Sequence, residues 1–332
     1  VYGGATVAAW YPITPSSSVA ESFQKYCEKY RVDPATGQHR FAIVQAEDEL
    51  ASVNMIIGAS YGGVPSLTAT AGPGLALMAE GIGLAVAAEV PIVVVDVMRG
   101  GPSTGIPAKS EQSDLSFAVD GLHGDAPRLV LAPTSIADCL ATTEWAVQLA
   151  EALQAPALVL SDQFMGQSRA VIDKPAHEAV PARRLVAEPN APEYRRYADT
   201  PSGVSPMAVP GTPGTVYTAD GLEHSERGIP SSGAADHRKQ LAKRERKLAQ
   251  HDYGARWADV EGEGTTAVIT FGSSSGPVRE AVQRLAAQGQ NVKLIVLRLL
   301  APVQPHLFDQ ALLGVEQVLV VEQNHGAQLY RY

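Results

Sequence analysis

The sequence predicts an α/β protein in which a parallel sheet covered by helices is followed by a second, smaller α/β domain. Short β-branched runs alternate with alanine-rich stretches of helical period from residue 1 to about 167, and such alternation favours a parallel sheet with crossover helices. Residues 92–95 are apolar without polar alternation, as expected of a strand buried on both faces. The alternation stops near residue 168 and returns at 265, so we expect three segments, 1–167, 168–264 and 265–332.

The first segment predicts five strands and four helices, in chain order. The expected strands are 42–44, 66–71, 91–97, 128–132 and 156–161. The expected helices are 16–30, 49–58, 75–87 and 135–153. Two of the helix starts carry proline followed by hydroxyl residues, namely Ser16 to Ser18 after Pro15, and Thr134 with Ser135 after Pro133. Serine and threonine are preferred N-caps, so these positions mark where the helices begin.

The middle segment, 168–264, is rich in proline and glycine and weakly periodic, which predicts a long extended connection with a few strands. The last segment regains the alternation, with strands expected at 266–271, 292–297 and 317–322 and a helix at 276–288.

One feature of the middle segment is a run of basic side chains. A solvated helix face is the favoured interpretation of such a run, and a site for an anionic ligand is the alternative. The run consists of Arg238, Lys239, Lys243, Arg244, Arg246 and Lys247.

Composition excludes several classes of protein. The 35 acidic residues exceed the 26 basic ones, giving a net charge of −9, which argues against a general nucleic-acid-binding surface. Cys27 and Cys139 are the only cysteines, too few for a disulfide framework or for an iron–sulfur cluster, which needs about four thiolates. The longest apolar stretch, 83–98, is interrupted by Glu89 and Asp96, so no membrane span is predicted.

The N-terminus shows no basic segment leading into an apolar one, so no secretory signal is predicted and a soluble, cytoplasmic protein is expected. Val1 is not a start methionine, and we therefore expect the chain to be processed or cut from something longer.

A glycine-rich turn at residues 70–74, TAGPG, joins a predicted strand to a helix. Glycines there let backbone N–H groups approach a ligand, and a helix N-terminus favours negative charge or a hydrogen-bond acceptor. Thr70, Gly72 and Gly74 are therefore candidate ligand-binding residues, with a purely structural turn as an equal alternative. No GxGxxG pattern and no P-loop lysine accompanies the turn, so nucleotide-binding motifs are absent.

Three acids, Glu47, Asp48 and Glu49, stand between a predicted strand and a predicted helix. Complementing the helix dipole explains them and is the favoured interpretation. The alternative is that one carboxyl enters an apolar pocket, where its pKa rises and it can exchange a proton with a ring nitrogen.

Two further segments offer polar side chains at strand ends. In residues 11–18, YPITPSSS, Ser16 or Ser17 is the expected N-cap, which leaves Thr14 for a ligand. Arg99 follows the buried strand, at the edge where open α/β sheets bind ligands. It can clamp a carboxylate through two hydrogen bonds, while an ordinary surface arginine is the alternative.

Taken together, these segments resemble one known family. The motifs YPITPSS, QAEDELAS, TATAGPG, VDVMRGGPSTGIP and HGD occur in this order and resemble the alpha subunit of the 2-oxoacid:ferredoxin oxidoreductases, above all its 2-oxoglutarate members. GLEHSERGIPS in the middle segment fits the same subunit. The resemblance implies a pyrimidine-binding domain of thiamine diphosphate enzymes at 1–167, an extended linker region at 168–264, and a transketolase C-terminal-like domain at 265–332.

The resemblance also implies roles for single residues. Glu49 matches the glutamate that hydrogen-bonds the aminopyrimidine ring of thiamine diphosphate and shares a proton with it, and the glycine turn joins it in cofactor binding. Thr14 and Arg99 match residues that bind the substrate carboxylate, and Ser103 and Thr104 are expected to line the same pocket. Glu47 and Asp48 are then expected on the surface or in an interface.

The implied reaction is oxidative decarboxylation of 2-oxoglutarate to succinyl-CoA and CO2, with electrons passed to ferredoxin through iron–sulfur clusters. The GDG segment and following asparagine that hold Mg2+ and the diphosphate are absent, and two cysteines cannot hold a cluster. The resemblance therefore implies a beta subunit that carries the Mg2+–diphosphate site and a 4Fe-4S cluster, in a dimer of heterodimers. A gamma domain, fused or separate, is also expected, and the chain alone is expected to be inert.

Several alternatives stay open at this point. Arg99 suits any 2-oxoacid, and no second cation for the distal carboxylate of 2-oxoglutarate is apparent, so pyruvate and branched-chain 2-oxoacids remain candidates. The beta part of a lipoamide-linked 2-oxoacid dehydrogenase pairs similar domains, but the YPITPSS and RGGPSTG segments argue against it. A scaffold that only binds a partner is the alternative from outside enzymology.

Overall fold

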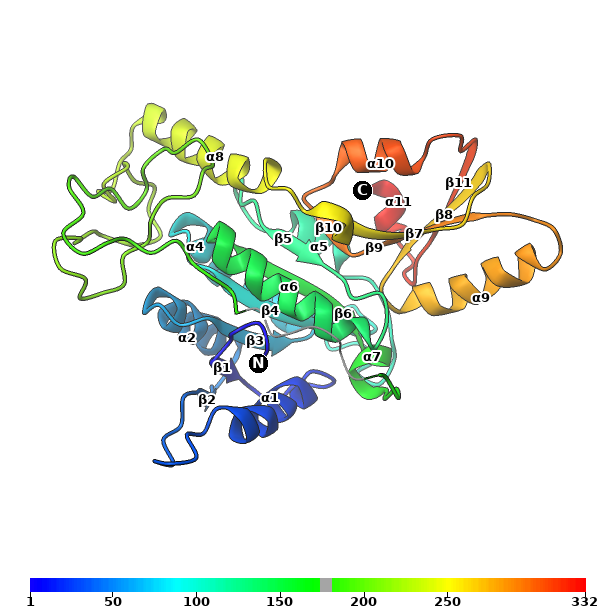
Figure 1. Cartoon of the computed structure of the whole chain (residues 1–332), viewed down its shortest axis with the longest axis horizontal. Coiled ribbons are helices and arrows are strands. Elements are labelled where there is room, and N and C mark those ends of the chain that lie inside the picture. Colours follow the sequence, from blue (N-terminus) through cyan, green and yellow to red (C-terminus); the bar gives the residue numbers. More distant parts are fainter. Residues whose placement is uncertain (174–180) are drawn as a thin grey trace.

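The computed structural model describes residues 1–173 and 181–332 and is built around two sheets (Figure 1). The strands of the larger sheet are β1 (Val7–Trp10), β2 (Ala42–Gln45), β3 (Ser66–Thr70), β4 (Ile92–Met98), β5 (Leu129–Leu131), β6 (Pro156–Asp162) and β10 (Leu299–Ala301). Their order is β10-β5-β6-β4-β3-β1-β2. Only β10 runs antiparallel to its neighbour, so the predicted parallel sheet is confirmed.

Helices cover this sheet. They are α1 (Ser17–Tyr30), α2 (Glu49–Tyr61), α3 (Gly72–Leu77), α4 (Ala79–Ala87), α5 (Leu115–Asp120), α6 (Asp138–Leu153) and α7 (Gln163–Gln167). In Figure 1, α6 lies across β4 and β6. Every residue of β4 is buried, as the unbroken apolar run predicts, because helices and neighbouring strands enclose it on all sides.

The structure differs from the expected elements at several positions, including the additional elements α5, α7 and β10. β1 was not expected, because four residues with two small alanines carry little strand signal. The helix expected at 75–87 begins earlier, at Gly72, and divides at Met78, whose amide is shared by the carbonyls of Gly74 and Leu75. Ser16 is the N-cap of α1, but its hydroxyl donates to the Ile13 carbonyl and caps no N–H group.

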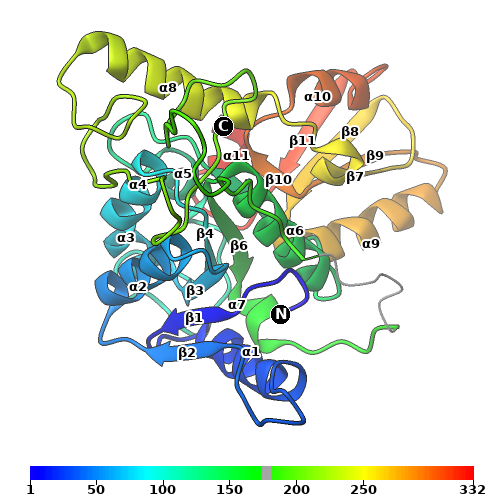
Figure 2. The same ribbon diagram turned by 60° about the vertical axis from the view of Figure 1, so that its left-hand side comes forward.

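The smaller sheet has the order β11-β8-β9-β7. Its strands are β7 (Ala258–Glu261), β8 (Thr266–Phe271), β9 (Lys293–Leu297) and β11 (Gln317–Val321), and α9 (Ser275–Ala286) and α10 (Pro305–Ala311) accompany them. Only β7 runs antiparallel. Figure 2 shows this sheet beside α6, on the far side of the larger sheet from α1 and α2.

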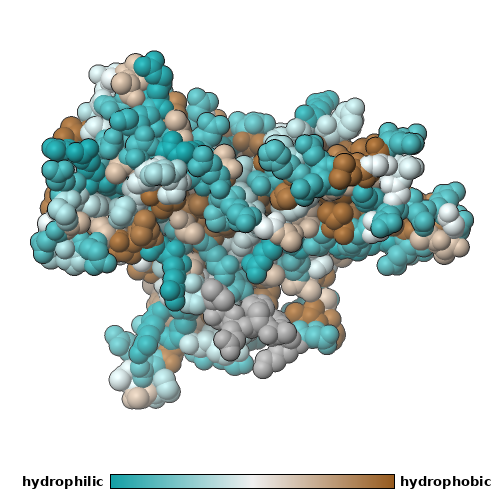
Figure 3. Space-filling view, turned by 45° about the horizontal axis from the view of Figure 1, so that its top comes forward, coloured by the Kyte–Doolittle hydropathy of each residue, from teal (hydrophilic) through white to brown (hydrophobic). Residues whose placement is uncertain are grey.

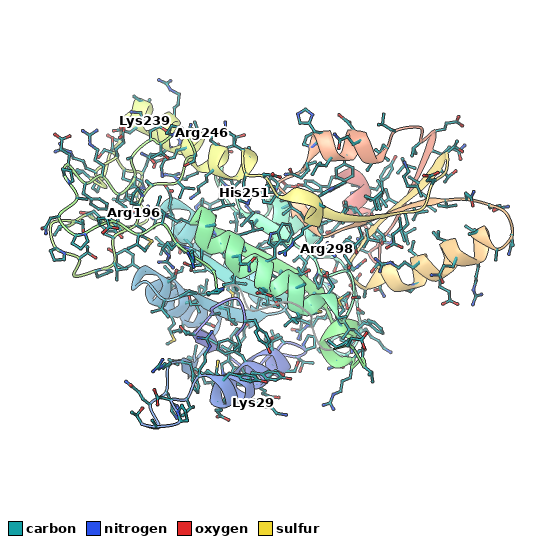
Figure 4. The ribbon with its side chains drawn as sticks, viewed as in Figure 1. Lys29, Arg196, Lys239, Arg246, His251 and Arg298 are labelled. Atoms are coloured by element: carbon teal, nitrogen blue, oxygen red, sulfur yellow. The ribbon has the colours of Figure 1, made fainter. Side chains whose placement is uncertain are left out.

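The two sheets are connected by a crossing of the chain and by the ion pairs of one arginine. After β9 the chain returns to the larger sheet, where β10 pairs with β5. At that crossing Arg298, labelled in Figure 4, donates to Asp138 at 3.0 Å and to Asp259 at 2.9 Å. The division of the chain at residues 167 and 264 stays a prediction. The strands nearest the crossing between the two sheets are β7 and β10.

In the middle segment, residues 168–173 and 181–233 are mostly irregular. Within 181–233 the structure has isolated bridges, such as Val186 with Met207 and His224 with Pro230, and no strand. The helix α8 (Ala234–Ala249) follows and lies above α4 in Figure 1.

The interpretation of α8 as a solvated basic face is wrong for part of the helix. Lys243 and Lys247 are buried and donate to the carboxylate of Glu89, Lys243 at 2.5 and 2.7 Å and Lys247 at 3.0 Å. Lys239 is on the exposed side of the helix, where the space-filling view is largely hydrophilic (Figures 3 and 4). The helix therefore has one solvated face and one face pinned to Glu89.

Two further properties concern the described residues as a whole and one groove among them. None of their helices combines the length and the apolar character needed to cross a bilayer. A groove of about 610 Å³ between α9 and the strands β8 and β11 carries no charged lining residue, so it offers no acid, base or carboxylate-binding group for catalysis.

Candidate active site

The predicted site residues gather at one edge of the larger sheet. Thr14 follows β1, Glu49 begins the helix after β2, Gly72 begins the helix after β3, and Arg99 follows β4. These strands are parallel, so their carboxyl ends meet at the same edge, which is where open α/β sheets bind ligands.

Glu49, Gly74 and two hydroxyl residues form the centre of this edge. The hydroxyls of Tyr11 and Thr70 are hydrogen-bonded at 2.6 Å. A Cβ atom on Gly74 would lie 2.1 Å from each of those oxygens and 3.1 Å from Cγ of Glu49. Only glycine therefore allows the turn to approach so closely, and the missing side chain leaves the carboxyl group and both hydroxyls beside one another.

Burial and charge keep Tyr11 protonated. Its pKa is raised well above the ordinary value, chiefly by burial, and the Glu49 carboxylate adds to the effect through charge and a hydrogen bond. A protonated phenol can donate a hydrogen bond, so Tyr11 supports Glu49 from below the turn. Thr70 is fully buried and its hydroxyl is occupied by Tyr11.

The two acids next to Glu49 have other surroundings. Asp48 is the N-cap of α2, and its carboxylate accepts the Ala51 N–H at 2.8 Å. Glu47 is exposed. Asp48 therefore performs the helix-capping task, which leaves the half-buried carboxyl of Glu49 available to a ligand.

Arg99 is nearly enclosed, with 6% of its surface exposed. Nη1 donates to the Thr14 carbonyl at 2.5 Å and Nη2 to the Thr104 carbonyl at 2.9 Å, while Nε has no partner in the part of the chain that the structure describes. The guanidinium thus ties the loop after β1 to the loop after β4. Because it has five N–H groups, it keeps donors for a carboxylate after both bonds.

The loop that carries Ser103 and Thr104 is a tight turn. Ser103 has a φ of +58°, and both residues are exposed. Gly105 is required there, since a Cβ atom on it would lie 1.7 Å from the Gly100 carbonyl oxygen. The structure therefore brings Thr14, Arg99 and Thr104 together and places Ser103 beside them on the surface.

Sequence reasoning missed three residues of this region: Tyr11, Asp96 and Asp114. Asp96 is fully buried in β4, and its carboxyl faces that of Asp114, which precedes α5. A Cβ atom on Gly72 would lie 2.7 Å from both oxygens of Asp114. The available signal was an acid inside an otherwise apolar strand, because a buried carboxyl always needs a compensating partner.

The described residues contain no group of three or more His, Cys, Asp or Glu side chains arranged to hold a metal ion. Cys27 is buried and Cys139 is half-buried, and both are free thiols. This part of the chain therefore offers carboxyl, hydroxyl and guanidinium groups at the site.

Comparison with known proteins shows the family of the chain. Residues 1–244 match the family described as pyruvate flavodoxin/ferredoxin oxidoreductase, thiamine diphosphate-binding. A 2-oxoacid:ferredoxin oxidoreductase subunit alpha from Saccharolobus solfataricus is 36% identical over 99% of this chain and 54% of its own. The 2-oxoglutarate synthase subunit KorA of Methanothermobacter marburgensis is 34% identical over 99% of this chain and 86% of its own.

A solved structure is similar over the same length. It is a 2-oxoglutarate:ferredoxin oxidoreductase from Magnetococcus marinus with 2-oxoglutarate, coenzyme A and succinyl-CoA bound. It is 41% identical, with a TM-score of 0.87, over 99% of this chain and 57% of that one. The chain thus spans about half the length of several of these proteins. The chain belongs to the thiamine-diphosphate-binding family of the pyruvate flavodoxin/ferredoxin oxidoreductases and, within it, to the 2-oxoacid:ferredoxin oxidoreductase alpha and KorA subunits.

Proposed function

We propose that this chain supplies one half of the active site of a cytoplasmic, thiamine-diphosphate-dependent 2-oxoacid:ferredoxin oxidoreductase that converts 2-oxoglutarate and coenzyme A to succinyl-CoA and CO2. The observation that carries the proposal is the placement of the Glu49 side chain against the Gly74 turn, with the Tyr11 hydroxyl beside its carboxyl group. The 41% identical solved relative, which holds 2-oxoglutarate and coenzyme A, supports the choice of substrates.

The residues present fit the aminopyrimidine end of thiamine diphosphate. A half-buried carboxyl group suits a ring nitrogen with which it can share a proton. The turn next to it packs closely against the Tyr11 and Thr70 hydroxyls and the Glu49 side chain because Gly74 has no Cβ atom, and we infer that the aminopyrimidine ring lies along this turn. When bound, the cofactor supplies the carbanion chemistry that breaks the bond between the carboxylate and the keto carbon.

Each of the chain's own groups has a task in this proposal. Glu49 holds a proton at its carboxyl oxygen and exchanges it with the ring nitrogen. Tyr11 stays protonated and orients Glu49. Arg99 binds the substrate carboxylate through the N–H groups that the Thr14 and Thr104 carbonyls leave free, and Thr14 and Ser103 complete that pocket. The loops around Arg99 also exclude water from the guanidinium.

The remaining parts of the active site are assigned to other subunits. The described residues hold no metal-binding cluster, and two cysteines are too few for a 4Fe-4S cluster. We therefore place the Mg2+–diphosphate site and the cluster on a beta subunit, in a dimer of heterodimers that delivers electrons to ferredoxin. A gamma domain is expected to be fused to one of these chains or separate.

The proposed function is tested by anaerobic reduction of a viologen dye. The complex is co-purified with its native partner and given coenzyme A with 2-oxoglutarate, pyruvate or branched-chain 2-oxoacids in turn. Dye reduction with 2-oxoglutarate alone is the expected result. Dye reduction with pyruvate or branched-chain acids would indicate a different substrate and the same mechanism. Reduction of lipoamide alone would indicate the dehydrogenase class. No reduction by a complex that holds thiamine diphosphate and clusters would contradict the proposal.

A further inference from the structure

Two carboxyl groups outside the roles assigned above face each other beneath the site. Asp96 is 0% exposed, and neither of its carboxyl oxygens has a hydrogen-bond donor among the described residues. Asp114 is half-buried, and its Oδ2 atom is likewise buried without a donor. The two carboxyl groups are within hydrogen-bonding reach of each other.

This arrangement requires a shared proton. A buried carboxylate without a donor costs several kcal/mol, and two adjacent carboxylates repel each other. One proton between them turns the repulsion into a charge-assisted hydrogen bond. Burial and the neighbouring Asp114 raise the pKa of Asp96 far above its ordinary value, whereas the pKa of Asp114 rises to about 6. Asp96 is thus the acid that donates, and Asp114 carries the negative charge.

The charged member of the pair lies between two predicted binding regions. Both oxygens of Asp114 adjoin Gly72, the first residue of the glycine turn. The Arg99 guanidinium lowers the pKa of Asp114, and the Glu111 carboxylate raises it. On the other side, the negative charge on Asp96 would raise the pKa of Tyr11. The negative charge of Asp114 is therefore near enough to Arg99 to interact with it, while the hydrogen bonds of the guanidinium go to the Thr14 and Thr104 carbonyls.

We propose that Asp96 and Asp114 are positioning residues that share one proton and take up a second when a substrate carboxylate binds Arg99. This rests on the proposed carboxylate-binding role of Arg99. An anion arriving at the guanidinium weakens its interaction with Asp114, so a proton from solvent neutralises Asp114. Binding of the 2-oxoacid is then linked to proton uptake near neutral pH.

The shared proton is tested by thermal unfolding of the complex, which does not depend on activity. A carboxyl whose pKa is raised on folding stabilises the protein below the unfolded pKa and loses that contribution as pH rises. Asp96→Asn removes the titration and keeps an N–H donor for Asp114. We expect the Asn variant to gain thermal stability relative to wild type between pH 5 and pH 8. The exposed control Asp125→Asn should show no such trend, and a constant difference for Asp96→Asn would overturn the shared proton.

The coupling to substrate is tested by titrating the complex calorimetrically with 2-hydroxyglutarate, which lacks the ketone and cannot be decarboxylated. Wild type should take up protons at pH 7, as seen from heats that differ between buffers of different ionisation enthalpy. The KM for 2-oxoglutarate should rise by up to about tenfold per pH unit above pH 6, with kcat affected less. Asp114→Asn should lose both effects, and Asp96→Asn should keep them.

The outcomes separate this inference from the proposed function. An Asp114→Asn complex with wild-type proton uptake would overturn the coupling while leaving the function intact. If the complex binds no 2-hydroxy- or 2-oxoacid at any pH, the coupling fails together with the proposed function. The unfolding experiment then still decides whether Asp96 and Asp114 share a proton.

Discussion

Glu89 and Asp96 interrupt the same apolar stretch, and both are fully buried, yet they are stabilised in opposite ways. Glu89 receives Lys243 and Lys247, with Arg196 nearby, and these cations hold the pKa of Glu89 far below its ordinary range. Asp96 lies against the carboxyl group of Asp114, and burial together with this neighbour raises the pKa of Asp96. The ion network around Glu89 holds elements of the fold together. A proton shared by Asp96 and Asp114 can instead respond to a ligand.

Arg99→Ala tests the carboxylate clamp at the level of one residue. Hydrogen bonds to charged groups contribute about 1.5–3 kcal/mol, so the KM for the 2-oxoacid should rise about 10- to 100-fold while thiamine diphosphate stays bound. The matched control is Arg40→Ala, because Arg40 is an exposed arginine paired only with Asp33. An unchanged KM in Arg99→Ala, measured by dye reduction, would count against the clamp.

Gly74→Ala tests the close approach of the glycine turn. The added methyl group would meet the hydroxyl oxygens of Tyr11 and Thr70 at 2.1 Å, and such overpacking costs about 1–3 kcal/mol. We expect a lower unfolding temperature and weaker cofactor binding. Gly58→Ala is the control, since nothing lies within 4 Å of that site in α2 and alanine favours a helix. Equal unfolding temperatures for the two variants would refute the close approach.

Among the elements, α8 shows how a local charge pattern misleads. Its basic run looks solvated in the sequence, because nothing local indicates that Glu89 lies against Lys243 from 154 positions away. The strand β4, in contrast, was predictable, because a strand that is buried on both faces has a run of apolar residues without polar alternation. Patterns thus reveal which residues are buried, but they do not reveal which distant partner a buried charge meets.

Lys243→Met tests whether α8 is pinned by charge. Removing one partner of a buried pair costs about 3–5 kcal/mol, so we expect a large fall in the free energy of unfolding measured with denaturant. Lys239→Met, on the exposed side of the same helix, should change little. Similar losses in both variants would indicate that helix propensity, and not the ion network, is responsible.

At the scale of the whole molecule, the parallel topology explains why much of the candidate site was predictable. Thr14, Glu49, Gly72 and Arg99 each follow a parallel strand, so the order of the motifs alone places them at one edge. Asp114 was not predictable, because the packing of its loop against Gly72 is a tertiary contact. The described residues contain no group of His, Cys, Asp or Glu side chains arranged to hold a metal ion.

Two exposed leucines beside the site suggest where a partner subunit binds. Leu50 follows Glu49 and Leu77 ends α3, and they are 51% and 54% exposed. We expect Leu77→Asp to weaken association with the proposed beta subunit, because the carboxylate would lose its hydration in an apolar interface. Leu313→Asp, at an even more exposed leucine of the smaller domain, is the control. Equal recovery of both variants in co-purification would place the interface elsewhere.

We expect the Glu49 carboxyl to exchange the proton on which catalysis depends. The most direct measurement compares dye reduction by the Glu49→Gln and Glu47→Gln complexes, each with its bound thiamine diphosphate quantified. Glu49→Gln should assemble, hold the cofactor and lose about two to four powers of ten in turnover, the scale of general acid–base catalysis. Glu47→Gln removes an exposed acid two positions away and should match wild type. Near-normal turnover in Glu49→Gln would contradict the role of Glu49 in proton exchange.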